Sequence, residues 1–328
     1  MATNWLLLTH GDPLETVRDF LLCLWEHSQM DGMLVPRFQS ETGGIEPYLV
    51  QQAADLKATD PFSPLVAGNA ARQVAQLSRE RPHARFVAVL RPCETLALER
   101  LSRRGLVDLS EWLVIGVDCL ASFPTEDFQW RLERAGGSEA LTYQMLQFAR
   151  QGGIAPYRFR GACQMCDHPS CQSADLMIGL VGLPVRENVL VMAKDEATVR
   201  RLGLHHTTDG PAPGKLVAQR ERAIARLRRR RMKTYQRQAA GLPATLPASL
   251  DQMVELWAEC VPCQECMLAC PVYAGELDSL GTDGPIQREA VRRWLQDCFA
   301  CGLCDEACPK ELPVSTLITR LVLQPVAV

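Results

Sequence analysis

Two copies of one cysteine pattern lie near the end of the chain. The first runs from Cys260 to Pro271 and the second from Cys298 to Pro309. Both read C-x2-C-x2-C-x3-C-P, a run whose thiolates hold cubane iron–sulfur clusters. A structural zinc site favours a longer gap between its cysteine pairs, and disulfides belong mainly to secreted proteins. We therefore predict two [4Fe-4S] clusters in this part of the chain.

The pattern also predicts which cysteines share a cluster. In such runs three closely spaced thiolates hold one cluster, and the fourth cysteine, before the proline, reaches the other. The predicted ligand sets are Cys260, Cys263, Cys266 and Cys308 for one cluster, and Cys298, Cys301, Cys304 and Cys270 for the other. A chain with these two sites is expected to carry electrons.

Composition limits the remaining possibilities. The chain has 328 residues, enough for two domains, and a formal net charge of -3, which argues against general nucleic-acid affinity. Its first ten residues lack the basic start of a signal peptide and are interpreted as a strand. No apolar stretch approaches the roughly 18 residues of a membrane span. Clustered thiolates require a reducing compartment, so we expect a cytoplasmic protein.

Short apolar runs alternate with helical spacing up to about residue 209, which predicts an α/β domain. Strands are expected at 86–90, 112–117, 177–181 and 189–192, and helices at 69–78, 94–103 and 141–150. Cys93 and Cys119 each follow one of these strands. Ligands of such sheets lie at the carboxyl ends of the strands, so neighbouring strand ends could bring the two thiols together. Cys23 lies in an apolar helical run and is expected in the core.

The C-terminal part is expected to be mainly helical. Residues 207–215 are rich in Gly and Pro and predict a linker, followed by a basic helix over 220–233. That helix is either a docking surface for an acidic or phosphate-bearing partner or a solvated face. Ser249 is the expected N-cap of a helix over 250–259, and another helix is expected over 286–296. Helices around both motifs resemble the helical ferredoxin domains of heterodisulfide reductase small subunits and succinate dehydrogenase iron–sulfur subunits.

A second set of landmarks runs through the α/β half in a fixed order. The landmarks are Pro92-Cys93-Glu94, Gly116-Val-Asp-Cys119, the C-x2-C pair Cys163 and Cys166, and Ala174-Asp175-Leu176 followed by Gly179 and Gly182. With these landmarks the chain resembles the beta subunits of coenzyme F420-reducing hydrogenase and F420-linked formate dehydrogenase. The resemblance covers roughly residues 45 to 195 and extends to the appended ferredoxin domain.

The resemblance implies a flavin, normally FAD, beside a third [4Fe-4S] cluster. Its implied ligands are Cys93, Cys119, Cys163 and Cys166. Cys171 departs from the family pattern, and it is either a replacement ligand or a nearby thiol. The implied domains are an α/β flavin and [4Fe-4S] domain over 1–206, a linker with the basic helix over 207–248, and a helical two-cluster ferredoxin domain over 249–328.

Four residues are candidates for contact with the flavin. Gly179 and Gly182 permit close backbone approach, Asn69 could hydrogen-bond a polar group, and Arg91 could hold a phosphate or stabilise a reduced anionic flavin. The alternatives are a turn glycine, a helix N-cap and a surface ion pair.

The expected function is an electron-transferring flavin and iron–sulfur oxidoreductase subunit. It would pass electrons between a two-electron carrier at FAD and a partner protein through [4Fe-4S] clusters. The resemblance implies partners such as hydrogenase, formate dehydrogenase or heterodisulfide-reductase-like subunits, and no catalytic residue is assigned. A flavin-free subunit that only conducts electrons and a zinc-binding scaffold are the alternatives.

Overall fold

The computed structural model describes residues 3–155, 157–243, 245–260, 263, 265–273 and 288–323. The chain forms two compact units. Unit 1 consists of Met1–Phe159 and His168–Arg229, and unit 2 of Arg160–Asp167 and Arg230–Val328. The short segment 160–167, which carries Cys163 and Cys166, therefore groups with the C-terminal part of the chain rather than with the flanking α/β residues.

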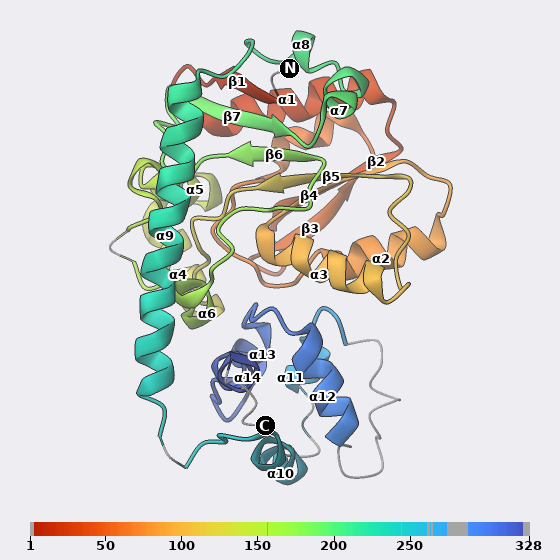
Figure 1. Ribbon diagram of the computed structural model, residues 1–328. Helices are drawn as coiled ribbons and strands as arrows, with labels where there is room; N and C mark the ends of the chain where they lie inside the picture. Colours follow the sequence, from red (N-terminus) through yellow and green to blue (C-terminus); the bar gives the residue numbers. More distant parts are fainter. Residues whose placement is uncertain are drawn as a thin grey trace. The chain divides into compact units, whose positions relative to one another are not determined.

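Unit 1 is built on a seven-stranded mixed sheet with the order β1-β7-β6-β5-β4-β2-β3 (Figure 1). The strands are β1 (Asn4–Leu8), β2 (Gly32–Gln39), β3 (Gly44–Val50), β4 (Phe86–Leu90), β5 (Trp112–Val117), β6 (Leu176–Gly179) and β7 (Asn188–Ala193). Neighbours from β2 through β4 and β5 to β6 are parallel, and the outer pairings are antiparallel. Strands β4 and β5 are buried along their whole length, as expected for parallel strands covered on both faces. The predicted α/β class is thus confirmed for this part of the chain.

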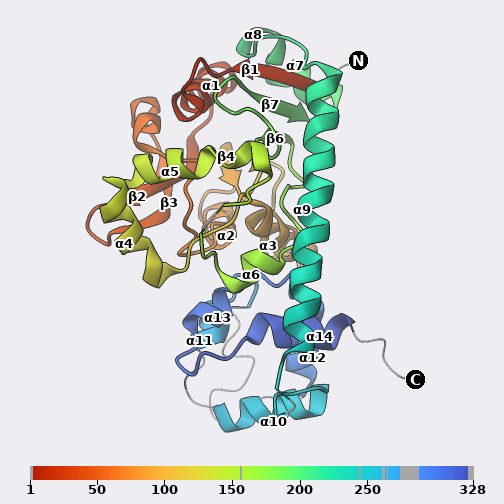
Figure 2. The same cartoon turned by 90° about the vertical axis from the view of Figure 1, so that its left-hand side faces the viewer.

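Most of the remaining regular structure of unit 1 is helical. The helices of this unit are α1 (Pro13–Ser28), α2 (Ala71–Glu80), α3 (Pro92–Arg103), α4 (Thr125–Ala135), α5 (Ser138–Leu146), α7 (Glu196–Arg201) and α8 (Leu204–Thr207), with 3-10 turns η1 (Ala53–Ala58) and η2 (Ala149–Gln151). Helix α9 (Gly214–Ala240) begins in unit 1 and ends in unit 2. Within unit 1 it passes the carboxyl end of β6 (Figures 1 and 2). None of the described helices combines the length and apolarity that a membrane-spanning helix needs.

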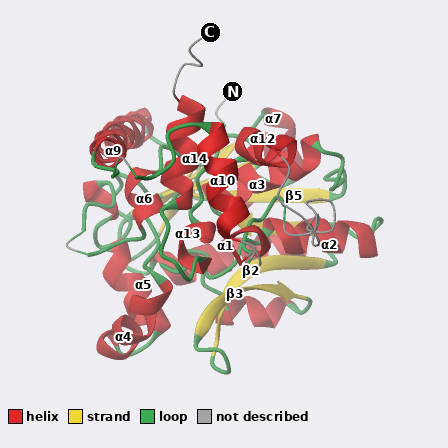
Figure 3. Cartoon of the chain, turned by 90° about the horizontal axis from the view of Figure 1, so that it is seen from below, coloured by secondary structure: helices red, strands yellow, loops and turns green. Residues whose placement is uncertain are grey.

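The described residues of unit 2 are helical and contain no strand (Figure 3). Its helices are α6 (Gly161–Met165), α10 (Leu250–Cys260), α11 (Glu265–Leu268), α12 (Arg288–Asp297), α13 (Leu303–Ala307) and α14 (Val314–Leu323). The Ser249 hydroxyl accepts a hydrogen bond from the Gln252 amide at 3.3 Å, so the predicted N-cap is confirmed. The first two residues of the helix expected over 286–296 lie outside the described residues.

Two details of unit 1 differ from expectation. The hairpin β2–β3 was not predicted, because a proline in each strand, Pro36 and Pro47, weakens the strand pattern; the two prolines face each other in the register. The prediction that Cys23 lies in the core is wrong, since its side chain is exposed. The helical period turns Leu21 and Leu24 inward but places Cys23 outward.

Candidate functional site

Four of the predicted cluster ligands line one pocket in unit 2. Cys270, Cys298, Cys301 and Cys304 surround about 370 Å³ of open space. The remaining lining is largely apolar and includes Val272, Trp294, Phe299 and Ile318. Four thiols in an apolar pocket are the donor set and the surroundings that a [4Fe-4S] cluster uses. Three of them come from the second motif and one, Cys270, from the first.

Backbone geometry orients the three cysteines of the second motif. Ala300 has a φ of 56° and Gly302 a φ of 73°, so both lie in the left-handed region that permits a tight turn. The Ala300 amide donates a hydrogen bond to the Cys298 sulfur at 3.4 Å. Amides that donate to cysteine sulfurs stabilise the thiolate form and tune a bound cluster. The local fold therefore fits an iron–sulfur site.

The electrostatics of this pocket favour neutral thiols unless a positively charged group is bound. Burial raises the pKa of the Cys301 thiol, and the neighbouring Cys270 and Cys298 raise it further. Burial likewise raises the pKa of Cys304 well above the ordinary value, with Asp305 adding to the effect. Four thiolates in this space would repel one another, so only a positively charged group such as an iron–sulfur core could hold them deprotonated.

The other predicted ligand set is described in part. Cys263 is exposed, Cys266 and Cys308 are half-buried, and the Cys260 side chain lies outside the described residues. Cys266 belongs to α11 and Cys308 follows α13, and these two helices contact each other. The structure thus associates the elements that carry Cys266 and Cys308, while the cluster itself stays a prediction.

The segment with Cys163 and Cys166 packs on the second motif within unit 2. The buried Arg160 donates to the Gly302 carbonyl at 2.9 Å and forms an ion pair with Glu306 at 2.9 Å. A Cβ atom at Gly302 would meet the Ala162 side chain at 2.2 Å, so glycine is required for this contact. Helix α6, which contains Cys163, is therefore fixed against the turn between Cys301 and Cys304.

In unit 1 the predicted cysteines gather at the carboxyl ends of neighbouring strands. Cys93 is the second residue of α3, directly after β4, and Cys119 follows β5; the two strands pair in parallel. The two strand ends are therefore neighbours in the sheet, and the proximity of the two thiols stays a prediction. The Cys119 amide donates to the Pro169 carbonyl at 2.8 Å, which brings the turn before Cys171 to the same edge. Cys93 and Cys119 belong to unit 1, whereas Cys163 and Cys166 belong to unit 2, and their sharing of one cluster stays a prediction.

Cys171 fills space beside β5. It is 7% exposed, and a Cβ atom at Gly116 would meet its sulfur at 2.6 Å. Burial raises the pKa of the Cys171 thiol to about 12. Gly116, the glycine of the Gly-x-x-Cys landmark, is explained here by the room it leaves for Cys171.

A second pocket lies in unit 1 at the same edge of the sheet. It is lined by residues 61–64 and 117–121, with Arg91 and Met145, and about 340 Å³ of space, part of it open to solvent, lies between them. Ala121 has a φ of 139°, a conformation that residues with a side chain rarely adopt and that is concentrated at functional sites. Cys119 lies in this lining, so a ligand in the pocket would contact a predicted cluster cysteine.

Two of the predicted flavin-binding residues present buried donors without partners. Arg91 is 5% exposed, and neither terminal nitrogen of its guanidinium has a hydrogen-bond partner among the described residues. The side-chain nitrogen of Asn69, Nδ2, is also buried and has no hydrogen-bond partner among the described residues. The Glu94 carboxylate links the segment that carries Asn69 to the segment that carries Arg91. It accepts hydrogen bonds from the backbone amides of Ala70 at 3.0 Å and Arg91 at 2.8 Å. Buried donors without acceptors are costly, so a ligand with phosphate or carbonyl oxygens fits this site.

Helix α9 explains the other two predicted flavin residues in a different way. A Cβ atom at Gly179 would meet Arg220 at 2.7 Å, and one at Gly182, where φ is +83°, would meet Ala223 at 2.3 Å. The close backbone approach expected at these glycines is thus made by a helix of the same chain. Their contact with a flavin stays a prediction.

Arg220 joins three loops at this edge of the sheet. It is buried, although the sequence places it in a basic surface helix, and its Nε donates to Asp118 at 2.8 Å. The same Asp118 oxygen accepts from the amides of Leu180 at 2.9 Å and Val181 at 3.1 Å. Arg220 also donates to Ser170 at 2.6 Å. The ion pair therefore fixes the loops next to Cys119, Cys171 and Gly179 relative to one another. This role could not be predicted from the sequence, because the two partners are 102 positions apart.

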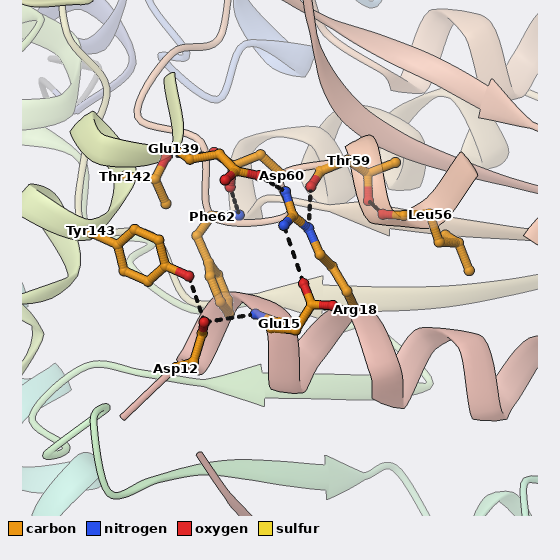
Figure 4. A network of polar contacts seen from close by, with 10 residues as sticks. All are labelled: Asp12, Glu15, Arg18, Leu56, Thr59, Asp60, Phe62, Glu139, Thr142 and Tyr143. Atoms are coloured by element: carbon orange, nitrogen blue, oxygen red, sulfur yellow. Dashed lines mark hydrogen bonds and ion pairs between the residues drawn. The ribbon is translucent and has the colours of Figure 1, made fainter. Parts of the chain in front are cut away.

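A buried polar network supports the walls of the unit 1 pocket (Figure 4). Arg18 of α1 donates to the Thr59 carbonyl at 2.8 Å and pairs with Glu139 of α5. Asp60 accepts hydrogen bonds from Thr142 of α5 and from the Phe62 amide, the latter at 3.0 Å. The network joins α1 and α5 to the segment 59–64, whose residues 61–64 line the pocket.

The pKa of Asp60 leads to a testable pH dependence. Burial raises this pKa to about 6, against the opposing effect of Arg18 and Arg91. The folded state therefore binds the Asp60 proton more tightly than the unfolded chain does. The free energy of unfolding should include this contribution at about pH 4 and lose it as the pH rises through about 6. The loss amounts to about 3 kcal/mol. Asp60→Asn keeps an acceptor oxygen and should flatten this slope in urea unfolding of the full chain. The exposed Asp19→Asn should retain it, and an unchanged slope in Asp60→Asn would refute the assignment.

Comparisons with known proteins show similarity to redox subunits. The chain is 21% identical over 274 residues to the F420-dependent formate dehydrogenase subunit beta of Methanocaldococcus jannaschii, a match that covers 71% of this chain and 69% of that relative. A shorter match, 25% identical over 91 residues, covers 28% of this chain and 11% of the acetyl-CoA decarbonylase/synthase complex subunit alpha 1 of Methanosarcina acetivorans. No family model matches the chain.

A solved structure shares the fold. A chain of the F420-reducing [NiFe] hydrogenase complex from Methanosarcina barkeri superimposes with a TM-score of 0.52 at 10% identity, over 72% of this chain and 91% of that one. The resemblance to the F420-linked beta subunits is confirmed. At this identity the structural likeness concerns the fold alone, and the sequence similarity to the formate dehydrogenase subunit beta extends over 71% of this chain.

Proposed function

We propose that the chain is an electron-transferring flavin and iron–sulfur subunit of an oxidoreductase complex. The observation that carries the proposal is the pocket lined by Cys270, Cys298, Cys301 and Cys304. Its four thiols come from two separate motifs, as cross-ligation requires. The relatives support the class, since they are a formate dehydrogenase subunit and a chain of a hydrogenase complex.

Each predicted group has residues of this chain that would hold it. Cys260, Cys263, Cys266 and Cys308 would hold one terminal cluster, and Cys270, Cys298, Cys301 and Cys304 the other. Cys93, Cys119, Cys163 and Cys166 would hold the third. Arg91, which lines the unit 1 pocket, would donate to oxygens of FAD, and Asn69 would be a second donor. The bound flavin would supply the exchange between two-electron and one-electron transfer.

The packing of α6 suggests the order of electron transfer. Cys163 and Cys166 lie on a segment that Arg160 and Ala162 fix to the turn at Gly302. The third cluster would therefore pass electrons first to the cluster at Cys301 and then to the one at Cys263. The terminal partner would be another redox subunit, of the hydrogenase, formate dehydrogenase or heterodisulfide-reductase-like kind.

Cofactor content after anaerobic purification tests the proposal. Three clusters give about twelve irons per chain, and denaturation should release one flavin per chain. Arg91→Met should weaken flavin binding about tenfold to a hundredfold, because a charge-assisted hydrogen bond is lost. The exposed Arg103→Met, on the same helix α3, is the matched control. Zinc in place of iron would refute the proposal, and full iron without flavin would leave a subunit that only conducts electrons.

A further inference from the structure

Helix α9 presents two opposite faces within unit 1. Its inner face carries the buried Arg220, Ala223 and Leu227. Its outer face carries Arg222, Arg226 and Arg229, all exposed. Their spacing of four and three residues places these three arginines, which we call the α9 arginine row, along one side of the helix.

Within the part of the chain that the structure describes, the α9 arginine row is not neutralised. No carboxylate of the described residues forms an ion pair with any of its three members. Like charges at these spacings destabilise a helix, and a negatively charged partner would relieve that repulsion. The row is also a local exception, because the chain as a whole has a formal net charge of -3.

The inner face connects the row to the predicted redox site. Arg220 is paired with Asp118, which precedes Cys119 and lines the unit 1 pocket. A helix with its side chains is about 10–12 Å across, so a partner on the outer face would lie roughly one helix diameter from the turn that holds Cys119. The same helix is rigidly anchored there, since Ala223 packs on Gly182. A partner docked on the outer face would therefore be held at a fixed distance from the turn that holds Cys119.

We infer that the α9 arginine row is the docking surface for an acidic electron-carrier protein. The inference rests on the proposed function, because it takes its choice of partner from the redox cysteines beneath the helix. Charge complementarity of this kind speeds association and makes it dependent on ionic strength. Duplex DNA and anionic lipid are the competing ligands of an arginine row, and the test includes both.

The experiment uses the full anaerobic protein and an acidic [2Fe-2S] ferredoxin as the probe. The variant Arg222→Gln/Arg226→Gln/Arg229→Gln should weaken ferredoxin binding about tenfold at low ionic strength and should remove most of its salt dependence. The matched control, Arg79→Gln/Arg81→Gln/Arg201→Gln, removes the same charge from exposed sites on other elements. It should change the affinity less than about twofold. A basic cytochrome c should not bind at this surface.

Three results would overturn the inference. The first is an equal loss of ferredoxin affinity in both variants, which would indicate a net-charge effect. The second is unchanged ferredoxin binding in the α9 variant. The third is binding of duplex DNA or phosphatidylserine vesicles through the same three arginines that is tighter than binding of ferredoxin. Iron and flavin are measured on every sample. Wild-type protein without iron would defeat the proposed function, whereas normal iron with unaffected ferredoxin binding would defeat the docking surface alone.

Discussion

Cys270→Ser should remove the cluster at the second cysteine motif and leave the cluster at its own motif in place. Cys270 stands in the first motif but lines the pocket of Cys298, Cys301 and Cys304. Serine is a poor replacement for a soft thiolate ligand, so the variant should lose about four of about twelve irons. Iron analysis and low-temperature electron paramagnetic resonance of the reduced protein are the measurements.

The lost cluster is identified by comparing the resonance spectrum of Cys270→Ser with the spectra of two further variants, Cys301→Ser and Cys266→Ser. Under cross-ligation the resonance missing from Cys270→Ser is the one missing from Cys301→Ser. If each motif closed on its own cluster, the missing resonance would instead match that of Cys266→Ser. Cys23→Ser is the control for thiol loss, since Cys23 is exposed on α1 and should cost no iron.

Arg220→Met should destabilise unit 1 by about 3–5 kcal/mol, because it leaves the Asp118 carboxylate buried without its ion pair. The Asp118 side chain is 0% exposed, so water cannot replace the guanidinium without opening the loops. Arg228→Met, an exposed arginine of the same helix, should cost less than about 0.5 kcal/mol. Urea unfolding followed by tryptophan fluorescence measures both.

A double variant separates the ion pair from simple loss of packing. Asp118→Asn combined with Arg220→Met removes both charges, so its cost should be smaller than the sum of the two single costs. Additive costs, or a cost for Arg220→Met no larger than that of Arg228→Met, would show that the pair does not support this part of the fold.

The strongest predictions from the sequence concerned local patterns. The apolar runs at 86–90 and 112–117 form β4 and β5 with the predicted bounds, because an uninterrupted buried run specifies a central parallel strand. Because the strand bounds were predicted correctly, the location of Cys93 and Cys119 just after the carboxyl ends of these strands was predicted as well. The spacing of the two C-terminal motifs predicted the grouping of Cys270 with the second motif, and the pocket brings those four thiols together.

The α/β class of unit 1, the family resemblance and the predicted cysteine ligand sets could thus be read from the sequence, since each depends on residues close together in the chain. What surrounds these residues follows only from the folded structure. Gly116 leaves room for Cys171, and Gly179 and Gly182 leave room for α9. Arg220, which belongs to a basic helix in the sequence, is buried and paired with Asp118 in the structure. These roles depend on which distant segment fills a space or neutralises a charge, and that is settled by packing across the whole unit rather than by any local pattern.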